Sequence, residues 1–230
     1  MVAAYLITGA GRGIGLEMVR QLRAGGHEVI GTVRRAEAGL ELKRLGARVE
    51  LLDTSDQAGV RALAEKLDGL AIDVLINNAG VYPDRRSKSM FEVTPEQILE
   101  ACRVNVCGPM LVTRALAGNL ERSHRKLAVQ ISSHMGSIAR AEAENAQGCL
   151  AYRSSKTALN MVNMLMAHEL AARGLTTVAL HPGWVRTEMG GPNALLSVEQ
   201  AVEKILATVA TFTNAHNGKF MDLDGRELPW

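Results

Sequence analysis

Three polar residues in the middle of the chain have the types and spacing needed to protonate an oxygen atom. Tyr152 and Lys156 are four residues apart, so on a helix both side chains lie on one face. A tyrosine phenol ordinarily has a pKa of about 10, and a nearby ammonium group favours the phenolate and lowers that pKa. Such a phenol can protonate a carbonyl oxygen while hydride reaches the carbon, and can take the proton back in reverse.

Ser133 precedes this pair and supplies the third group. Its hydroxyl could hydrogen-bond a developing alkoxide and hold the carbonyl in place. Ser132 is the alternative, although the spacing Ser133-x-x-Gly136 favours the second serine. Two adjacent serines can also simply cap a turn or a helix. Ser133, Tyr152 and Lys156 together therefore predict a proton-transfer site.

A glycine-rich segment near the start of the chain has the composition of a phosphate-binding turn. It reads Thr8-Gly9-Ala10-Gly11-Arg12-Gly13-Ile14-Gly15, which fits T-G-x-x-x-G-x-G rather than G-x-G-x-x-G. Without Cβ atoms the backbone can turn tightly and approach a pyrophosphate, whose charge a helix N-terminus favours. Such a segment can be only a turn, but its position after the first predicted strand favours dinucleotide binding.

The end of the second predicted strand bears on the choice of dinucleotide. An NAD site usually has an acidic residue there to hold the ribose hydroxyls. The segment instead reads Gly31-Thr32-Val33-Arg34-Arg35. Arg34 and Arg12 could clamp a 2′-phosphate, because guanidinium groups match phosphate geometry, or both could be solvated surface side chains. We therefore expect NADP(H) rather than NAD(H).

The elements that must position these residues alternate between short apolar strands and longer helical patterns. Strands are predicted near residues 4–8, 28–33, 48–52, 74–76, 127–132, 176–181 and 219–221, and helices near 14–24, 38–45, 57–67, 95–116, 151–173 and 198–210. Strands that are apolar on both faces and separated by helices indicate a parallel sheet covered on both sides. The predicted fold class is α/β, a Rossmann-type doubly wound, seven-stranded, mostly parallel sheet with helices on both faces.

The unusual residues fall at the carboxyl ends of the predicted strands, where such sheets bind ligands. The glycine turn, Asn77-Asn78-Ala79-Gly80, Ser132-Ser133 and Pro182-Gly183 follow the first, fourth, fifth and sixth strands. We expect residues 1–230 to form one NADP(H)-binding domain, with substrate loops near 134–150 and 184–196. Gly190-Gly191-Pro192 breaks regular structure in the second loop, which could be a mobile lid or a static loop.

Taken in this order, the motifs resemble the short-chain dehydrogenase/reductase family over nearly the whole chain. Segments 131–138, 152–156, 181–187 and 224–230 are similar to the subgroup that contains C-factor and the Sniffer carbonyl reductases. The separation of Ser133 and Tyr152 is longer than is commonest in the family, because of the polar segment 140–149. That segment would border the substrate entrance, where His134 and Cys149 could line the mouth or only pack.

The resemblance implies a role for each site residue. Tyr152 would be the general acid/base, Ser133 would orient the carbonyl, Lys156 would tune the phenol and contact the ribose, and Asn105 would hold a water in a proton relay. The implied cofactor contacts are Gly9, Gly11, Arg12, Gly13, Ile14, Gly15, Arg34, Asp53 at the adenine, Asn78, Ala79, Gly80, Tyr152, Lys156, Pro182, Gly183, Val185 and Thr187. Asn77 would stabilise the sheet; for Asn77 and Asn105 a purely structural role stays open, since buried Asn often bridges backbone groups.

Composition argues against several other kinds of protein. A net charge of +2 with no basic tract gives no reason to expect nucleic acid or an anionic membrane as a partner. The three cysteines lack metal-ligand spacing, so no metal site is expected. No signal peptide or membrane span is recognisable, and a reducing cytoplasm is the expected location.

The predicted function is NADPH-dependent reduction of a ketone, aldehyde or quinone to an alcohol. The partners expected are a small carbonyl or alcohol substrate and further copies of the chain, since helices 95–116 and 151–173 pair across a dimer interface in the resembled family. We therefore expect the protein to form a homodimer or homotetramer. The alternative is an NADP(H)-binding signalling or regulatory protein with little turnover, which would not need a tuned phenol.

Overall fold

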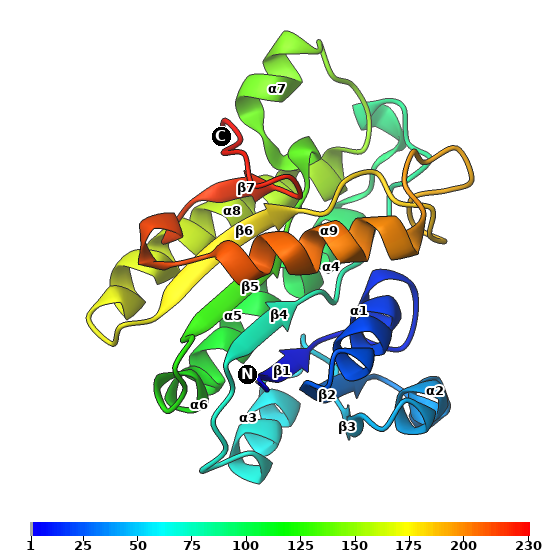
Figure 1. Cartoon of the computed structure of the whole chain (residues 1–230). Coiled ribbons are helices and arrows are strands. Elements are labelled where there is room, and N and C mark those ends of the chain that lie inside the picture. Colours follow the sequence, from blue (N-terminus) through cyan, green and yellow to red (C-terminus); the bar gives the residue numbers. More distant parts are fainter. Residues whose placement is uncertain (1) are drawn as a thin grey trace.

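Seven short strands form one sheet in the order β3-β2-β1-β4-β5-β6-β7 in the computed structural model, which describes residues 2–230 (Figure 1). The strands are β1 (Ala4–Ile7), β2 (Glu28–Val33), β3 (Arg48–Leu51), β4 (Val74–Asn77), β5 (Leu127–Ile131), β6 (Thr176–His181) and β7 (Phe220–Asp222). All six pairings between neighbouring strands are parallel. The chain order reverses between β1 and β4, which makes a crevice beyond the carboxyl ends of these strands. The predicted doubly wound α/β fold is confirmed.

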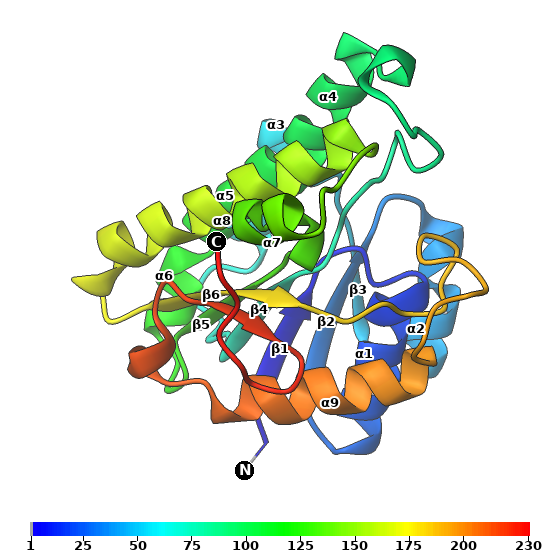
Figure 2. The same ribbon diagram turned by 90° about the horizontal axis from the view of Figure 1, so that it is seen from above.

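Helices cover both faces of the sheet (Figure 2). They are α1 (Gly13–Ala24), α2 (Leu40–Arg44), α3 (Gln57–Lys66), α4 (Pro95–Cys102), α5 (Gly108–Ala115), α6 (Ala117–Glu121), α7 (Ile138–Ala143), α8 (Leu150–Ala171) and α9 (Val198–Thr211). Side chains alternate across β1: Tyr5 and Ile7 belong to the core shared with α1 and α9, whereas Leu6 belongs to the core shared with α3 and α5. The site is therefore carried by a sheet whose two faces are both buried.

The prediction of one continuous α-helix over residues 95–116 is wrong. Its first part, α4, starts with a capping box between Thr94 and Gln97. A π-helical turn, Arg103–Cys107, then separates α4 from α5. Pro109 has no N–H to donate to the carbonyl of Asn105, so regular α-helical bonding cannot continue through this point. Asn105, in the middle of this turn, is fully buried.

The segment predicted as a loop near residues 134–150 contains regular structure. A 3-10 turn, His134–Gly136, is followed by α7, and the hydroxyl of Ser137 accepts a hydrogen bond from Arg140 N at the start of that helix. The segment 184–196 is irregular, apart from an isolated bridge between Val185 and Leu196. Within residues 2–230 no helix combines the length and apolar character needed to span a membrane.

Candidate active site

Tyr152 and Lys156 lie on one face of α8, as their spacing predicts, and both side chains are buried. The Lys156 Nζ atom lies 5.7 Å from the centre of the Tyr152 ring. The same atom donates a 2.7 Å hydrogen bond to the carbonyl oxygen of Ile131, the last residue of β5. The long helix is therefore tied to the sheet at the residue that precedes the two serines.

The two serines after β5 face different surroundings. Ser132 Oγ donates a 2.6 Å hydrogen bond to Asn160 Oδ1 inside the protein. Ser133 caps the 3-10 turn by accepting from Met135 N at 3.1 Å, and its hydroxyl also hydrogen-bonds the Tyr152 phenol and lowers the pKa of that group. The geometry thus brings Ser133 to Tyr152, and gives Ser132 a structural partner.

Burial dominates the electrostatics of this pair. Burial raises the pKa of Tyr152 to about 12, and the hydrogen bond with Ser133 opposes that rise. Burial also lowers the pKa of Lys156 to about 8. Desolvation of the charged phenolate therefore sets the direction of the Tyr152 pKa, and its lowering by the Lys156 ammonium stays a prediction.

Asn105 is held between the segment after β4 and helix α8. Its Oδ1 accepts from Val81 N at 2.8 Å, and its Nδ2 donates to Val81 O at 2.9 Å and to Ser155 Oγ at 3.0 Å. A Cβ atom on Gly80 would lie 3.2 Å from Asn105 Oδ1 and 3.9 Å from Lys156 Nζ. Asn105 is thus adjacent to the proton-transfer residues, and its role in a water relay stays a prediction.

The glycine turn has the geometry of an anion-binding helix start. Helix α1 begins at Gly13, which has a φ of +54°, and it has neither a side-chain cap nor an acidic residue in its first turn. Its first backbone N–H groups can therefore bind a phosphate. Gly9 packs so closely that a Cβ would lie 2.9 Å from Ala79 Cα. These residues fit a pyrophosphate.

The end of β4 holds the glycine turn in place. Asn78 Nδ2 donates to the carbonyl oxygens of Thr8 and Gly9 at 3.0 and 3.1 Å, and the Ala79 N–H donates to Thr8 Oγ1 at 3.0 Å. Asn77 has a different environment: its Nδ2 donates to Thr113 Oγ1 and Gln130 Oε1. These contacts support a sheet-stabilising role for Asn77.

The residues predicted to read the adenosine end lie on the surface. Arg12, Arg34 and Asp53 are all exposed. Hydrogen bonds from Ser55 lower the pKa of the Asp53 carboxyl, and the positive charge of Arg34 lowers it further, so these side chains lie near each other after β3 and β2. Arg12 forms an ion pair with Glu188 of segment 184–196.

The segment after β6 crosses toward the glycine turn. Gly183 adopts a φ of +81°, directly after Pro182. Thr187 lies so near α1 that its Cγ2 would be 3.4 Å from a Cβ on Gly13, and its Oγ1 accepts from Gly190 N at 3.0 Å. Thr187 and Arg12, which are predicted to contact opposite ends of the cofactor, thus both lie at the start of α1 together with Gly11, Ile14 and Gly15. Val185, in the same segment as Thr187, is buried.

Sequence reasoning missed two residues that contact Tyr152. The Tyr82 ring stacks on the Tyr152 ring with centroids 4.0 Å apart, and Asp84 accepts hydrogen bonds from the backbone at the start of α8. Their only sequence signal is that they follow Asn77-Asn78-Ala79-Gly80. His134, whose role was left open, hydrogen-bonds His181 at 3.0 Å, and Cys149 occupies the N-cap of α8 with a φ of +53°.

A parallel doubly wound sheet with an uncapped glycine turn and a buried Ser–Tyr–Lys group at the same edge defines a Rossmann-type oxidoreductase. A family model described as short chain dehydrogenase matches residues 3–195, and the chain belongs to this family. The predicted family resemblance is confirmed.

Three known proteins illustrate the similarity. C-signal of Myxococcus xanthus is 37% identical over 171 residues, which cover 74% of this chain and 100% of that protein. The carbonyl reductase Sniffer of D. melanogaster has a TM-score of 0.91 and 28% identity, with 100% of both chains covered. The NADPH-bound carbonyl reductase from chicken fatty liver has a TM-score of 0.90 and 30% identity, covering 100% of this chain and 99% of that one.

Proposed function

We propose that this short-chain dehydrogenase reduces the carbonyl group of a small ketone, aldehyde or quinone to an alcohol with NADPH. The chain is an NADP(H)-dependent oxidoreductase, in line with a structural neighbour at 30% identity that was solved with NADPH bound. The observation that carries the proposal is the buried contact of Ser133, Tyr152 and Lys156 at the same sheet edge as the uncapped start of α1.

NADPH, when bound, would supply the hydride for the carbonyl carbon. Tyr152 Oη would deliver the proton to the carbonyl oxygen, while the Ser133 hydroxyl holds that oxygen by a hydrogen bond. Proton transfer leaves a buried phenolate, which is costly without an opposite charge. Lys156 in its ammonium form supplies that charge next to the ring, and so would favour the transfer.

The residues that would hold the cofactor follow the cleft from one end to the other. The backbone of Gly9, Gly11, Gly13, Ile14 and Gly15 would bind the pyrophosphate; Arg12 and Arg34 the 2′-phosphate; Asp53 the adenine; Asn78, Ala79 and Gly80 the adenosine ribose; and Lys156, Pro182, Gly183, Val185 and Thr187 the nicotinamide end. Tyr152 lies beside Lys156 at that end. Asn105 would hold a relay water that returns a proton to this group.

The loops beside the site and the exposed faces of the helices have their own expected roles. Residues 1–230 would act as one domain, with the loops near 134–150 and 184–196 shaping the substrate entrance. Self-association through α4, α5 and α8 is supported by the exposed apolar side chains of Leu99, Met161 and Leu165. A regulator without turnover is not favoured, since simple cofactor binding does not require a buried phenol in contact with Ser133.

A substrate screen tests the proposal directly. Quinones, aldehydes, ketones and hydroxysteroids would be offered to the purified protein while NADPH absorbance is followed, with Tyr152→Phe protein as the matched control. We expect carbonyl-dependent loss of NADPH absorbance for the wild-type protein only. Equal rates for both proteins with every carbonyl compound would refute the role of Tyr152, and no rate with any of them would refute the reductase.

A further inference from the structure

We propose that segment 81–84, which follows β4, positions Tyr152 for proton transfer through Asp84 and Tyr82. This inference rests on the proposed function, because it takes Tyr152 as the proton donor. Neither residue belongs to the proton-transfer group or to the predicted cofactor contacts. Asp84 holds the backbone of Tyr152, and Tyr82 covers one face of its ring.

Asp84 supplies the N-terminal cap that α8 lacks locally. The N-cap residue Cys149 is in the left-handed region, with a φ of +53°, and makes no capping hydrogen bond through its side chain. Asp84 is 2% exposed; its Oδ2 accepts from Ala151 N at 2.6 Å and its Oδ1 from Tyr152 N at 3.2 Å. These N–H groups belong to the first helical turn, where no intrahelical acceptor exists, and an anion is favoured there. A buried carboxylate thus binds the backbone of the proton donor itself.

Tyr82 fixes the ring of Tyr152. The two ring centroids are 4.0 Å apart and the planes differ by 24°, which is a stacked arrangement. The Tyr82 hydroxyl makes a long 3.8 Å contact with Met135 Sδ, and burial followed by a hydrogen bond with the Cys149 thiol raises the pKa of Tyr82. Tyr82 lies just before a turn over residues 83–86 and Asp84 lies within it, and both side chains reach the start of α8.

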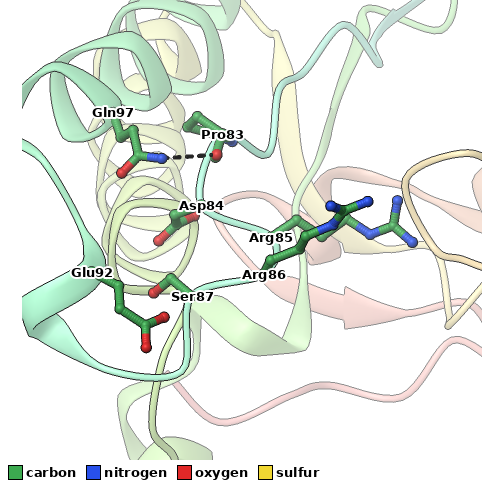
Figure 3. Close-up of a pocket in the computed structure, with 7 residues that line it drawn as sticks. All are labelled: Pro83, Asp84, Arg85, Arg86, Ser87, Glu92 and Gln97. Carbon is green, nitrogen blue, oxygen red and sulfur yellow. Dashed lines mark hydrogen bonds between the residues drawn. The ribbon is translucent and has the colours of Figure 1, made fainter.

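Segment 81–84 is itself anchored at both ends, as a positioning element must be. Val81 exchanges two hydrogen bonds with Asn105 in the π-helical turn. Pro83 O accepts a 3.0 Å hydrogen bond from Gln97 Nε2 on α4 (Figure 3). Figure 3 also shows the side chains of Arg85 and Arg86 directed away from Asp84, toward the opposite side of the segment. The phenol is therefore linked to β4 and α4 through a short, hydrogen-bonded path.

The first test compares two Asp→Asn variants of the full-length protein. In Asp84→Asn, one of the two acceptor oxygens becomes an NH2 donor that faces a backbone N–H. Asp73→Asn is the matched control, because Asp73 also accepts a backbone hydrogen bond, from Ala4 N at 2.9 Å, but at the amino ends of the strands. We expect Asp84→Asn to lower kcat about tenfold or more, since small displacements of a reacting group cost this much. The Kd for NADPH should stay within about twofold in both variants.

Two further readouts separate positioning from a purely structural role. Hydrogen exchange of the amides in residues 149–156 should be faster in Asp84→Asn than in Asp73→Asn. The solvent deuterium isotope effect on kcat should rise in Asp84→Asn, because delivery of the Tyr152 proton becomes slower. Tyr82→Leu should show the same rise, whereas Tyr82→Phe keeps the stacked ring and should retain kcat within about twofold.

The outcomes separate this inference from the proposed function. Wild-type turnover with equal kcat in the Asp84→Asn and Asp73→Asn variants would overturn the role of Asp84. Unchanged amide exchange in residues 149–156 would overturn it at any level of activity. If none of the carbonyl compounds causes the wild-type protein to oxidise NADPH, the reductase function itself is refuted. The inference about positioning Tyr152 then has no reaction to act on.

Discussion

The amine of Lys156 lies 5.7 Å from the centre of the Tyr152 ring and is fixed there by the carbonyl oxygen of Ile131. Burial shifts the two groups in opposite directions, raising the pKa of Tyr152 to about 12 and lowering that of Lys156 to about 8. In both cases burial favours the neutral form of the side chain over its charged form. The lysine must therefore stay protonated to stabilise a phenolate, which makes its ionisation a measurable property of the site.

Replacing Tyr152 by Phe should remove the proton donor and leave the ring in place. We expect kcat to fall by about 10²–10⁴-fold, the usual contribution of a general acid. The Kd for NADPH, measured by fluorescence titration, should change little, because the cofactor is expected to be held by many other residues. A rate within a few-fold of wild type would contradict the assignment.

Replacing Lys156 by Met should change how stability depends on pH. The pKa of Lys156 is lowered by burial to about 8 in the folded protein, against 10.5 for an unperturbed lysine. Between these values the unfolded chain binds more protons, so the free energy of unfolding of the wild type rises with pH. The gain is about 2 kcal/mol between pH 8 and about pH 9.5, and it is absent in Lys156→Met.

Urea unfolding at several pH values measures this difference. The series should stop below about pH 10, because the raised pKa of Tyr152 makes folded-state stability fall as pH increases above that point. Lys43→Met, at an exposed position on α2, is the control and should follow the wild-type curve. Parallel curves for Lys156→Met and wild type would show that Lys156 titrates normally in the folded state.

The two adjacent serines should respond differently to replacement by Ala. Ser133→Ala removes the hydroxyl that faces Tyr152, and we expect kcat to fall by about 10²-fold, as for loss of one oxyanion donor. Ser132→Ala leaves Asn160 Oδ1 buried without its 2.6 Å partner, which should lower the free energy of unfolding by about 1–3 kcal/mol. Steady-state kinetics and urea unfolding of both variants check this, and a larger kcat loss in Ser132→Ala would reverse the assignment.

Replacing Arg34 by Ala should weaken NADPH binding relative to NADH binding. Loss of a charge-assisted hydrogen bond to phosphate is worth about tenfold or more in the ratio of the two Kd values. Arg44→Ala is the matched control, since Arg44 is exposed on α2 and pairs with Glu41. The preference for NADPH should persist in the control. An unchanged ratio in Arg34→Ala would make Arg34 a solvated surface residue.

The strand ends were predictable from sequence because they combine two independent patterns. Apolar runs mark strands that are buried on both faces, and turn residues mark where each strand stops. The parallel order then brings Gly9, Asn78, Ser133 and Gly183 to one edge without any knowledge of contacts. The fold and the place of the site follow from these two patterns.

Several features could not be predicted in this way. The π-helical turn Arg103–Cys107 lies inside one helical pattern, and Pro109 was its only sign. Helix α7 is short and has no buried residue, and only the capping residue Ser137 marks it. The contacts of Asp84 join positions 67 and 68 residues apart, for which no local pattern exists. The pKa of Tyr152 depends on burial, which spacing alone does not give.

The π-helical turn also makes the number of residues between α4 and α5 matter. Removing one residue from it would rotate the residues that follow by about 100° relative to α4. Gly108 packs closely on Thr54, since a Cβ atom on Gly108 would lie 2.9 Å from Thr54 Oγ1, and the rotation would separate the two residues. It would also move the Thr113 hydroxyl away from Asn77. A one-residue deletion here would therefore break the contacts of α5 with both Thr54 and Asn77, whereas the exposed segment around Phe91 should accept changes in length.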